Sequence, residues 1–278
     1  MSTSLIKYLG EIPRRLIYLV IIILLVFATM FPLKVPMTIS DSTRKVYETI
    51  DALKPGDIVL CQGANAFMWM VECSGAVVAV VNHLATKEGV KLIILPMSPE
   101  QGYFMEYCLS LSEYPKSKIY GEDWAFLDYL PGMDPALDAF LNDVHKTVSV
   151  DWYGTPIDEL PVMNLIKDHH DIDVFISVGS GPYQAIYFVN AKNPNIIILD
   201  LDQASWYSYV VMYIKTGQIY GATNGPRGAG EYERLLGQSG LGTSMTDAVS
   251  LTTALIIILL IIGNIHDAII KRGKVVPK

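Results

Sequence analysis

Two long apolar stretches near the ends of this 278-residue chain constrain its fold more than any other feature. The first follows Arg14 and Arg15 and has no charged residue between Leu16 and Leu33. Its length is close to the roughly 20 residues that a helix needs to cross a bilayer. The sequence therefore predicts an N-terminal transmembrane helix over 16–35. A cleaved signal peptide is the alternative, although the end of the stretch lacks the small residues of a cleavage site.

The second apolar stretch covers residues 248–265. It contains Ser250, Thr252 and Thr253, whose hydroxyls can bond to carbonyl groups of the preceding helical turn. We predict a second transmembrane helix here. Because the stretch is near the minimum length for a span, a buried core helix is the alternative.

Basic residues next to the two stretches predict the orientation in the membrane. The tails 1–15 and 266–278 are both basic, with Lys7, Arg14, Arg15, Lys271, Arg272, Lys274 and Lys278. Basic residues near spans concentrate on the cytoplasmic side. We therefore expect both tails in the cytoplasm and the central domain outside the cell membrane. The first stretch is less informative, because Lys34, Arg44 and Lys45 follow it on the other side.

The central region is strongly acidic. The chain has a net charge of −7, and its tails carry seven basic and two acidic residues, a net of +5, which leaves −12 for the remainder. Such a region is repelled by phosphate backbones, so nucleic-acid binding is not expected. His169 and His170 are adjacent rather than one helical turn apart, so no metal site is predicted. The cysteines are too few for a disulfide framework and are expected as buried free thiols, with one disulfide as the alternative: Cys61, Cys73 and Cys108.

Residues 36–236 read as one α/β domain, joined to the second apolar stretch by a linker over 237–247. Strands are expected at 57–61, 91–95, 124–127, 173–178, 195–199 and 218–221, and helices at 65–86, 99–112, 134–148 and 157–167. Several of the strands are continuously apolar, as strands covered on both faces must be. We predict a doubly wound, mainly parallel sheet that is Rossmann-like or flavodoxin-like.

Candidate ligand-binding residues follow the fourth expected strand. Ligands in open parallel sheets bind beyond the carboxyl ends of the strands. Gly179, Ser180 and Gly181 form a short turn before Pro182, where free N–H groups at a helix start can hold an anion. Glycine turns between strand and helix are also common packing devices, and this one is not the dinucleotide fingerprint.

Two aspartates follow the fifth expected strand. Asp200 and Asp202 resemble the Asp-x-Asp pair with which some glycosyltransferases hold a metal-bound sugar nucleotide. Residues two apart on a strand face the same side, so both carboxylates can meet one cation. The alternative is that an aspartate here caps the next helix. Arg227, in a glycine-rich segment, is a further candidate contact for an anion, unless it pairs with Glu231 or Glu233.

Four segments together carry a resemblance to a family. They are LKPGDIVL, DWYGTPIDELPVM, GQIYGATNGPRGAGEYERLLG and LIIGNI. The chain resembles an uncharacterised family of prokaryotic membrane proteins in which two transmembrane helices flank an α/β domain. The family has no assigned activity, so the resemblance implies the topology and no functional residue.

The sequence favours a non-catalytic, membrane-anchored module that binds a ligand or partner and self-associates into a homo-oligomer. Aromatic segments such as Trp206 to Tyr209 suit contact surfaces, and burial of these tyrosines in the core is the alternative. One alternative is a membrane-bound enzyme acting on a nucleotide, sugar or lipid headgroup. Another is a structural scaffold that forms a membrane oligomer. The sequence assigns no ligand and no cofactor.

Overall fold

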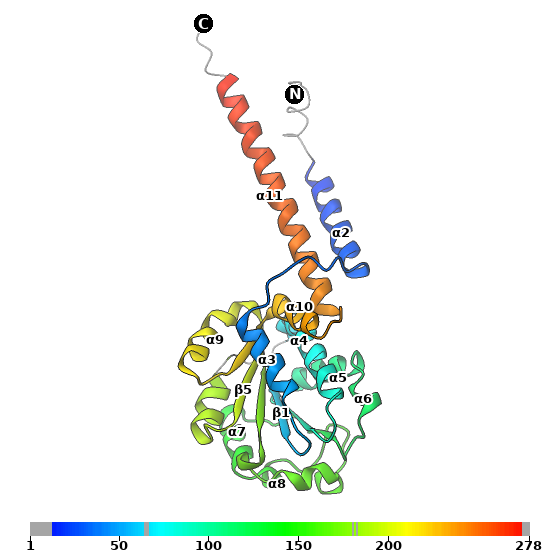
Figure 1. Cartoon of the computed structure of the whole chain (residues 1–278), viewed down its shortest axis with the longest axis vertical. Helices are drawn as coiled ribbons and strands as arrows, with labels where there is room; N and C mark the ends of the chain where they lie inside the picture. The colour runs from blue at the N-terminus through cyan, green and yellow to red at the C-terminus, as the bar shows by residue number, and fades with distance from the viewer. Residues whose placement is uncertain (1–12, 64–66, 180, 182, 274–278) are drawn as a thin grey trace. The chain divides into compact units, whose positions relative to one another are not determined.

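The computed structural model describes residues 13–63, 67–179, 181 and 183–273 (Figure 1). Contacts divide the chain into two units. Met37–Thr243 forms an α/β unit, and the segments before and after it form a second unit that contains α2, Arg14–Met30, and most of α11, Leu241–Gly273.

The α/β unit is built on a six-stranded sheet in which every neighbouring pair of strands is parallel. The strands are β1 Ile58–Gly63, β2 Lys91–Pro96, β3 Trp124–Phe126, β4 Val174–Val178, β5 Ile197–Asp202 and β6 Gly221–Asn224. Their order is β3-β2-β1-β4-β5-β6. The predicted α/β sheet is confirmed, and this order is the Rossmann arrangement rather than that of flavodoxin.

Helices cover both faces of the sheet (Figure 1). One face packs against α3 Asp41–Asp51, α4 Phe67–Ala85, α5 Pro99–Ser110, α6 Tyr114–Ser117 and α10 Gly225–Leu235. The other packs against α7 Met133–Asn142, α8 Val144–Thr147, α9 Ala204–Thr216, the 3-10 turns η1 Ile157–Glu159 and η2 Pro161–Leu165, and the π-helix η4 Ala185–Asn190. A further 3-10 turn is η3 His169–Asp171. Burial on both faces explains why the strands are almost continuously apolar.

The last two strands lie further along the chain than the apolar pattern predicts. The fifth was expected over 195–199 and runs over Ile197–Asp202; the sixth was expected over 218–221 and runs over Gly221–Asn224. The ladder continues because Asp200 pairs with Ser177 of β4 and Asp202 pairs with Asn224 of β6. The two aspartates are therefore inside the sheet rather than in the loop after it.

Two expected helices are broken. The helix expected over 134–148 ends at Asn142, and the side chain of Asp143 accepts the N–H of Lys146 to begin α8. The helix expected over 157–167, with a break or bend at Pro161, consists of two 3-10 turns, η1 and η2, separated by Leu160. Pro161 explains the break, because proline disfavours a helical conformation in the residue before it.

Two buried carboxylates on α10 hold the segments at which the chain enters and leaves the α/β unit. Glu231 accepts the N–H and the hydroxyl of Ser40 at 3.0 and 2.6 Å, and Ser40 caps α3. Glu233 accepts the N–H groups of Gly240, Gly242 and Thr243 at 2.7–2.8 Å. These groups begin α11, where intrahelical acceptors are missing. The helix therefore starts at Leu241, within the expected linker 237–247, and not at 248.

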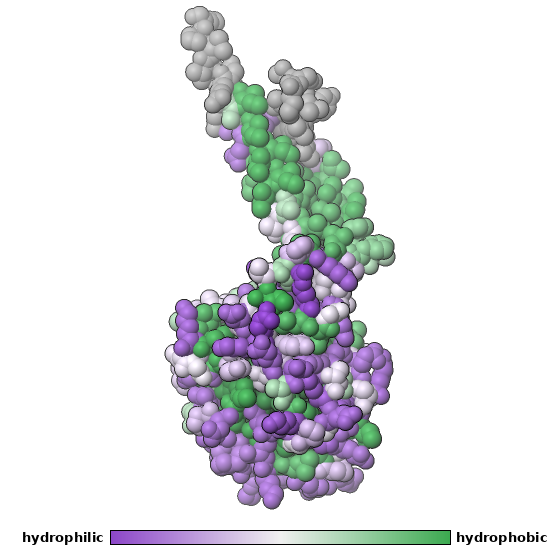
Figure 2. All heavy atoms as spheres, viewed as in Figure 1, coloured by the Kyte–Doolittle hydropathy of each residue, from purple (hydrophilic) through white to green (hydrophobic). Residues whose placement is uncertain are grey.

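Among the described residues, one helix is long and apolar enough to cross a membrane, the part Leu241–Ile269 of α11. Only 6% of its apolar window is buried, which argues against a buried core helix. α2 has only 17 residues, so the described residues contain one candidate span and not the two flanking spans that the sequence predicted. Figure 2 shows apolar surface over both helices, and α2 exposes Leu19, Ile22, Ile23 and Val26.

A buried carboxylate also fixes the segment that follows α2. Asp247 of α11 is fully buried and accepts the N–H groups of Lys34 and Val35 at 2.9 and 3.0 Å. Lys34 adopts a left-handed conformation with φ of 56°. Within this unit, the end of the first apolar stretch is therefore bonded to the beginning of the second helix.

Candidate functional site

A row of polar side chains crosses one face of the sheet at the carboxyl ends of its central strands. Gln62 of β1 pairs in register with Ser177 of β4, and Ser177 pairs with Asp200 of β5. Asp202 and its partner Asn224 of β6 lie two residues further along. Residues two apart on a strand share a face, so all five lie on the same face. Parallel sheets of this kind bind ligands at this edge.

Most oxygen atoms of this row lack a hydrogen-bond partner. They are Gln62 Oε1, Ser177 Oγ, both carboxylate oxygens of Asp200, Asp202 Oδ2 and Asn224 Oδ1, and none has a partner in hydrogen-bond geometry among the described residues. Asp200 is 0% exposed and Asp202 1% exposed. More than about 90% of buried polar groups in proteins are bonded. These exceptions cluster at the edge where parallel sheets of this order bind ligands, and they define the candidate site.

Burial raises the pKa of both aspartates. The pKa of Asp200 lies well above its usual value, first because of burial and then because of the charge of Asp202, while the Ser177 hydroxyl lowers it. Burial raises the pKa of Asp202 to about 6, and the N–H groups of Gln203 and Gly181 partly offset this increase. Desolvation penalises the charged form of each carboxyl. The site therefore holds negative charge at a cost that a cation or a proton can relieve.

Asp202 connects the site to the glycine turn after β4. Its Oδ1 accepts the Gln203 N–H at 2.8 Å, and it also accepts from Gly181. Gly181 has φ of 70° and lies against Trp206, whose ring carbons would be 3.5 Å from an added Cβ. With its amide oriented to donate to Asp202, Gln203 also accepts from Trp206 Nε1 at 2.7 Å. Hydrogen bonds and packing contacts thus connect the end of β5, the glycine turn after β4 and the indole ring of Trp206.

Asp202 does not cap α9, the alternative that the sequence left open. The N-cap of that helix is Gln203, whose side chain makes no capping bond. Glu72 of α4 accepts the N–H of Ala204, the first residue of α9, at 3.1 Å. The charge of Glu72 also raises the pKa of Asp202. Glu72 is therefore a third carboxylate at this edge, and no ion pair found among the described residues includes any of the three.

Two glutamines form hydrogen bonds at the β1 end of the row. Gln62 Nε2 donates to Gln184 Oε1 at 2.7 Å, and Gln184 Nε2 donates to Asp134 at 2.9 Å. Gln184 precedes the π-helix η4. π-Helices are rare and often occur at functional sites. This one begins at Ala185, four residues after Gly181.

The structure brings some of the predicted site residues together and separates another. Gly181, Asp200 and Asp202 belong to the site, and Gly179 follows β4 with φ of 60°. Ser180 lies outside the described residues. Arg227 is 59% exposed and pairs with Glu231, Nε to Oε1 at 3.0 Å. None of the described contacts of Arg227 reaches the aspartates. The carboxylate of Asp202, which accepts from Gly181, opposes binding of a free anion at the glycine turn.

Sequence reasoning did not identify Gln62, Ser177, Asn224 or Glu72 as site residues. Gln62 directly follows the expected strand over 57–61, and Ser177 stands inside the expected strand over 173–178, where it looks like an ordinary polar interruption. Glu72 gave a signal, because it is the only acidic residue in a long apolar helix. Gln62, Ser177 and Asn224 are brought together by the register between strands, which a single sequence does not reveal.

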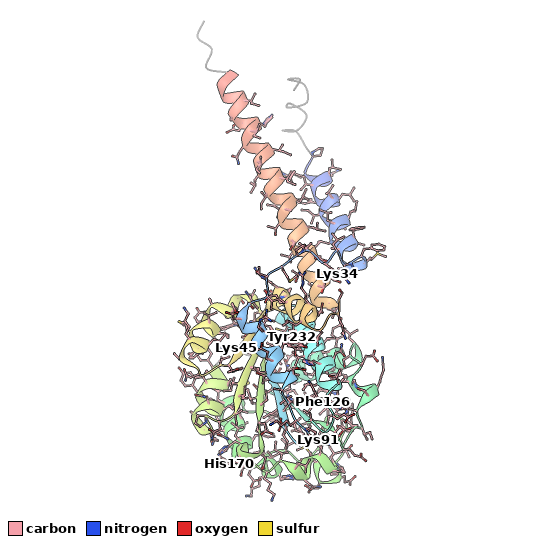
Figure 3. The ribbon with its side chains drawn as sticks, in the orientation of Figure 1. Lys34, Lys45, Lys91, Phe126, His170 and Tyr232 are labelled. Atoms are coloured by element: carbon pink, nitrogen blue, oxygen red, sulfur yellow. The ribbon has the colours of Figure 1, made fainter. Side chains whose placement is uncertain are left out.

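A second cluster of ligating atoms lies at η3. Asp168, His169 and His170 each place one ligand atom within 4.8 Å of the others, although no metal site was expected from adjacent histidines. The 3-10 turn brings the two rings to 4.0 Å, tilted by 32°. His170 is exposed and bonded to Asp168 Oδ1 at 2.7 Å, and Figure 3 shows it away from Tyr232 of α10. These three side chains therefore form a group that could hold a metal ion, which the adjacent histidines did not predict.

His170 also lines a cavity of about 700 Å³ with Glu48, Asp57, Asp173 and Tyr220. These residues lie at the amino ends of the strands, opposite to the edge at which such sheets bind ligands. The cavity is therefore separate from the site at Asp200 and Asp202.

An exposed aromatic cluster borders the site at η4 and α9. Tyr183 stacks on Tyr187 with centroids at 6.1 Å and meets Trp206 edge-on at 6.2 Å, and Trp206 contacts Tyr209 at 5.3 Å. The three tyrosines are 49–59% exposed. Because Trp206 also contacts Gly181, this surface is continuous with the glycine turn.

The three cysteines are buried free thiols, and burial raises the pKa of Cys61 to about 12. Neither a disulfide nor a reactive thiol is present at these positions.

Comparison of the chain with protein families, curated proteins and solved structures gave no match.

Proposed function

We propose that this protein is a membrane-anchored module that binds a small ligand at the carboxyl edge of β4, β5 and β6. The observation that carries the proposal is the row of buried oxygens without partners, centred on Asp200 and Asp202. An unpaired buried polar group costs about 1–3 kcal/mol. Several such groups at the ligand-binding edge of a Rossmann-ordered sheet are best explained by a ligand that completes their hydrogen bonds or neutralises their charge.

A second candidate is a membrane-bound enzyme acting on a nucleotide, sugar or lipid headgroup. The raised pKa values of the aspartates favour it, because a carboxyl with a pKa of about 6 suits proton transfer near neutral pH. We rank it second because no positively charged side chain among the described residues pairs with the carboxylates of the site, so none is placed there to stabilise developing negative charge.

Native mass spectrometry of the full chain, purified in mild detergent, tests ligand binding. We expect the wild-type protein to carry a small-molecule or ion adduct that the double variant Asp200→Asn/Asp202→Asn loses. Asp158→Asn is the matched control, since Asp158 is 83% exposed and pairs only with His145 among its described contacts. An unliganded wild-type spectrum, or an adduct retained by the double variant, would contradict the proposal. The same spectra report the subunit number, and the exposed aromatic cluster leads us to expect a homo-oligomer.

We further propose that α2 is a second span and that both tails are cytoplasmic. The exposed apolar side chains of α2 support this, and so does the bond network between Asp247 and the segment at Lys34. At about 1.5 Å per residue, 17 residues extend about 26 Å, slightly less than the hydrocarbon thickness of about 30 Å. Arg14 and Arg15, the first two residues of α2, would then lie at the membrane surface.

Thiol labelling in intact cells tests this topology. Ser239 is exposed, and the native cysteines are buried, so the wild-type chain gives little background. We expect a membrane-impermeant reagent to label Ser239→Cys from outside and to leave Ser4→Cys unlabelled until the cells are opened. Labelling of Ser4→Cys in intact cells would reverse the orientation or place the tails on opposite sides. Extraction of the protein by alkaline carbonate would contradict a membrane span altogether.

A further inference from the structure

We infer that the row at Asp200 and Asp202 binds one hard divalent cation of the Mg²⁺ type. This inference rests on the proposed ligand site and names part of what fills it. It starts from the chemistry of the atoms without partners, which in this row are all oxygens of carboxylate, amide or hydroxyl groups. Oxygen ligands of this kind suit Mg²⁺, Mn²⁺ and Ca²⁺, whereas Zn²⁺ and Cu²⁺ favour nitrogen and sulfur.

The strand register places the oxygens for a common ion. Asp200 and Asp202 are two residues apart on one strand, which corresponds to about 6.6 Å, and Asn224 faces Asp202 from the next strand, about 4.8 Å away. Side chains from these three positions can therefore reach a single ion with metal–oxygen distances of about 2.1 Å. Ser177 faces Asp200 from the other side.

Observations beyond the pair of acids also point to a bound ion. Gln62 and Ser177 are each 1% exposed, belong to the same row and have an oxygen without a described partner. A helix cap does not account for the aspartates, because Gln203 occupies the N-cap of α9. Compensation by a basic side chain does not account for them either, since no described ion pair includes Asp200, Asp202 or Glu72. A cation accounts for both the charge and the oxygens.

The protein oxygens do not fill an octahedral shell. Mg²⁺ usually keeps several waters and one or two carboxylates and completes its shell with ligand oxygens. Coordination positions would thus remain for a second ligand at the glycine turn after β4. The ion would make that place favourable for an anionic oxygen, which the carboxylates alone repel.

Binding of Mn²⁺ to the full chain in detergent, after removal of metals with EDTA, tests the inference. We expect electron paramagnetic resonance to show one saturable Mn²⁺ per chain, displaced by Mg²⁺. Asp200→Asn and Asp202→Asn should each weaken Mn²⁺ binding by more than about tenfold. This is a lower bound, because loss of a residue that only supports a metal ligand already weakens metal binding by about tenfold or more. Asp158→Asn, with the same change in charge, should bind as the wild type does.

Two outcomes would overturn the inference. One is the absence of saturable one-to-one Mn²⁺ binding in the wild type, and the other is equal binding by the folded aspartate variants, with folding checked by circular dichroism. An aspartate pair that shares a proton instead of an ion would give the first outcome. If Mn²⁺ fails to bind while native mass spectra still show an adduct that depends on Asp200 and Asp202, only the cation is wrong and the ligand site stands.

Discussion

Asp200→Asn is expected to stabilise the metal-free protein by about 1–3 kcal/mol, the cost of leaving a buried polar group unpaired. The wild-type carboxylate is fully buried, and neither its oxygens nor Asp202 Oδ2 have a partner in hydrogen-bond geometry among the described residues. An asparagine amide removes the charge and can donate to that oxygen. For a domain of this size, about 1 kcal/mol shifts the melting temperature by about 2–4 °C. Binding sites often sacrifice stability in this way.

The pH dependence gives a second measure of the same effect. Because the pKa of Asp200 is raised on folding, the folded state holds its proton at pH values at which the unfolded chain has released it. Stability from this group is thus fully present below the unfolded pKa of about 3.8 and is lost as pH rises through the folded pKa. Asp202 acts in the same direction up to about pH 6. We expect wild-type stability to fall as the pH rises from about 4 through about 6, and Asp200→Asn to flatten this decline.

Urea unfolding of EDTA-treated protein at several pH values measures both effects, with Asp158→Asn as the control for net charge. Carboxyls with a lowered pKa, such as Asp51 and Asp123, contribute stability that is lost only as the pH falls below about 4. Their titration therefore does not overlap the decline expected for Asp200 and Asp202. A less stable Asp200→Asn variant with an unchanged pH profile would show that Asp200 has a structural partner, and it would remove the main support for the ligand site.

Gly242→Val is expected to destabilise the α/β unit by about 1–3 kcal/mol or more, the usual result of overpacking. A Cβ at Gly242 would lie 2.5 Å from the carbonyl carbon of Ala229 and 2.6 Å from the amide nitrogen of Gly230. These are backbone atoms of α10, so the clash cannot be relieved by a side-chain rotation. Gly75 of α4 approaches the same point, since its Cβ would lie 2.9 Å from the Gly242 nitrogen. Displacement of Gly242 would also weaken the bonds that Glu233 accepts.

Thermal unfolding in detergent, followed by circular dichroism, measures this change. Gly263→Ala is the matched control, because Gly263 belongs to the same helix α11 and has nothing within 4 Å of an added Cβ. That control should stay within about 1 kcal/mol of the wild type, since alanine favours a helix over glycine by about that much. Equal effects of the two substitutions would mean that the contact between α10 and the start of α11 is looser than the structure shows.

Apolar pattern alone was enough to predict the architecture of the α/β unit. The runs at Ile58, Leu92 and Val174 are too continuously apolar for strands exposed on one face, so they imply a sheet covered by helices. Ser98 and Pro99 likewise mark the start of α5, where the Ser98 side chain accepts the Gln101 N–H at 3.2 Å. These features depend on neighbours in the sequence, and for that reason they can be predicted without the fold.

The ends of β5 and β6 show what pattern could not predict. An apolar run followed by two aspartates looks like a strand that has ended, because isolated buried carboxylates are costly. Here the strand continues through Asp202, since β4 and β6 supply its ladder partners. The same limitation applies to α11, which begins at Leu241 because Glu233, several residues earlier in another helix, accepts its first N–H groups.

The sequence by itself determined that the chain has an apolar helix able to span a membrane and a parallel α/β sheet, because hydrophobic periodicity and length are local properties. It also singled out Asp200, Asp202 and Gly181. Only the tertiary structure decided the Rossmann strand order, the burial of both aspartates and their grouping with Gln62, Ser177 and Asn224. Those depend on which strands become neighbours and in what register, and that choice is made by packing between segments more than 100 residues apart, as for Ile58 and Asp173, whose hydrogen bond joins positions separated by 115 residues.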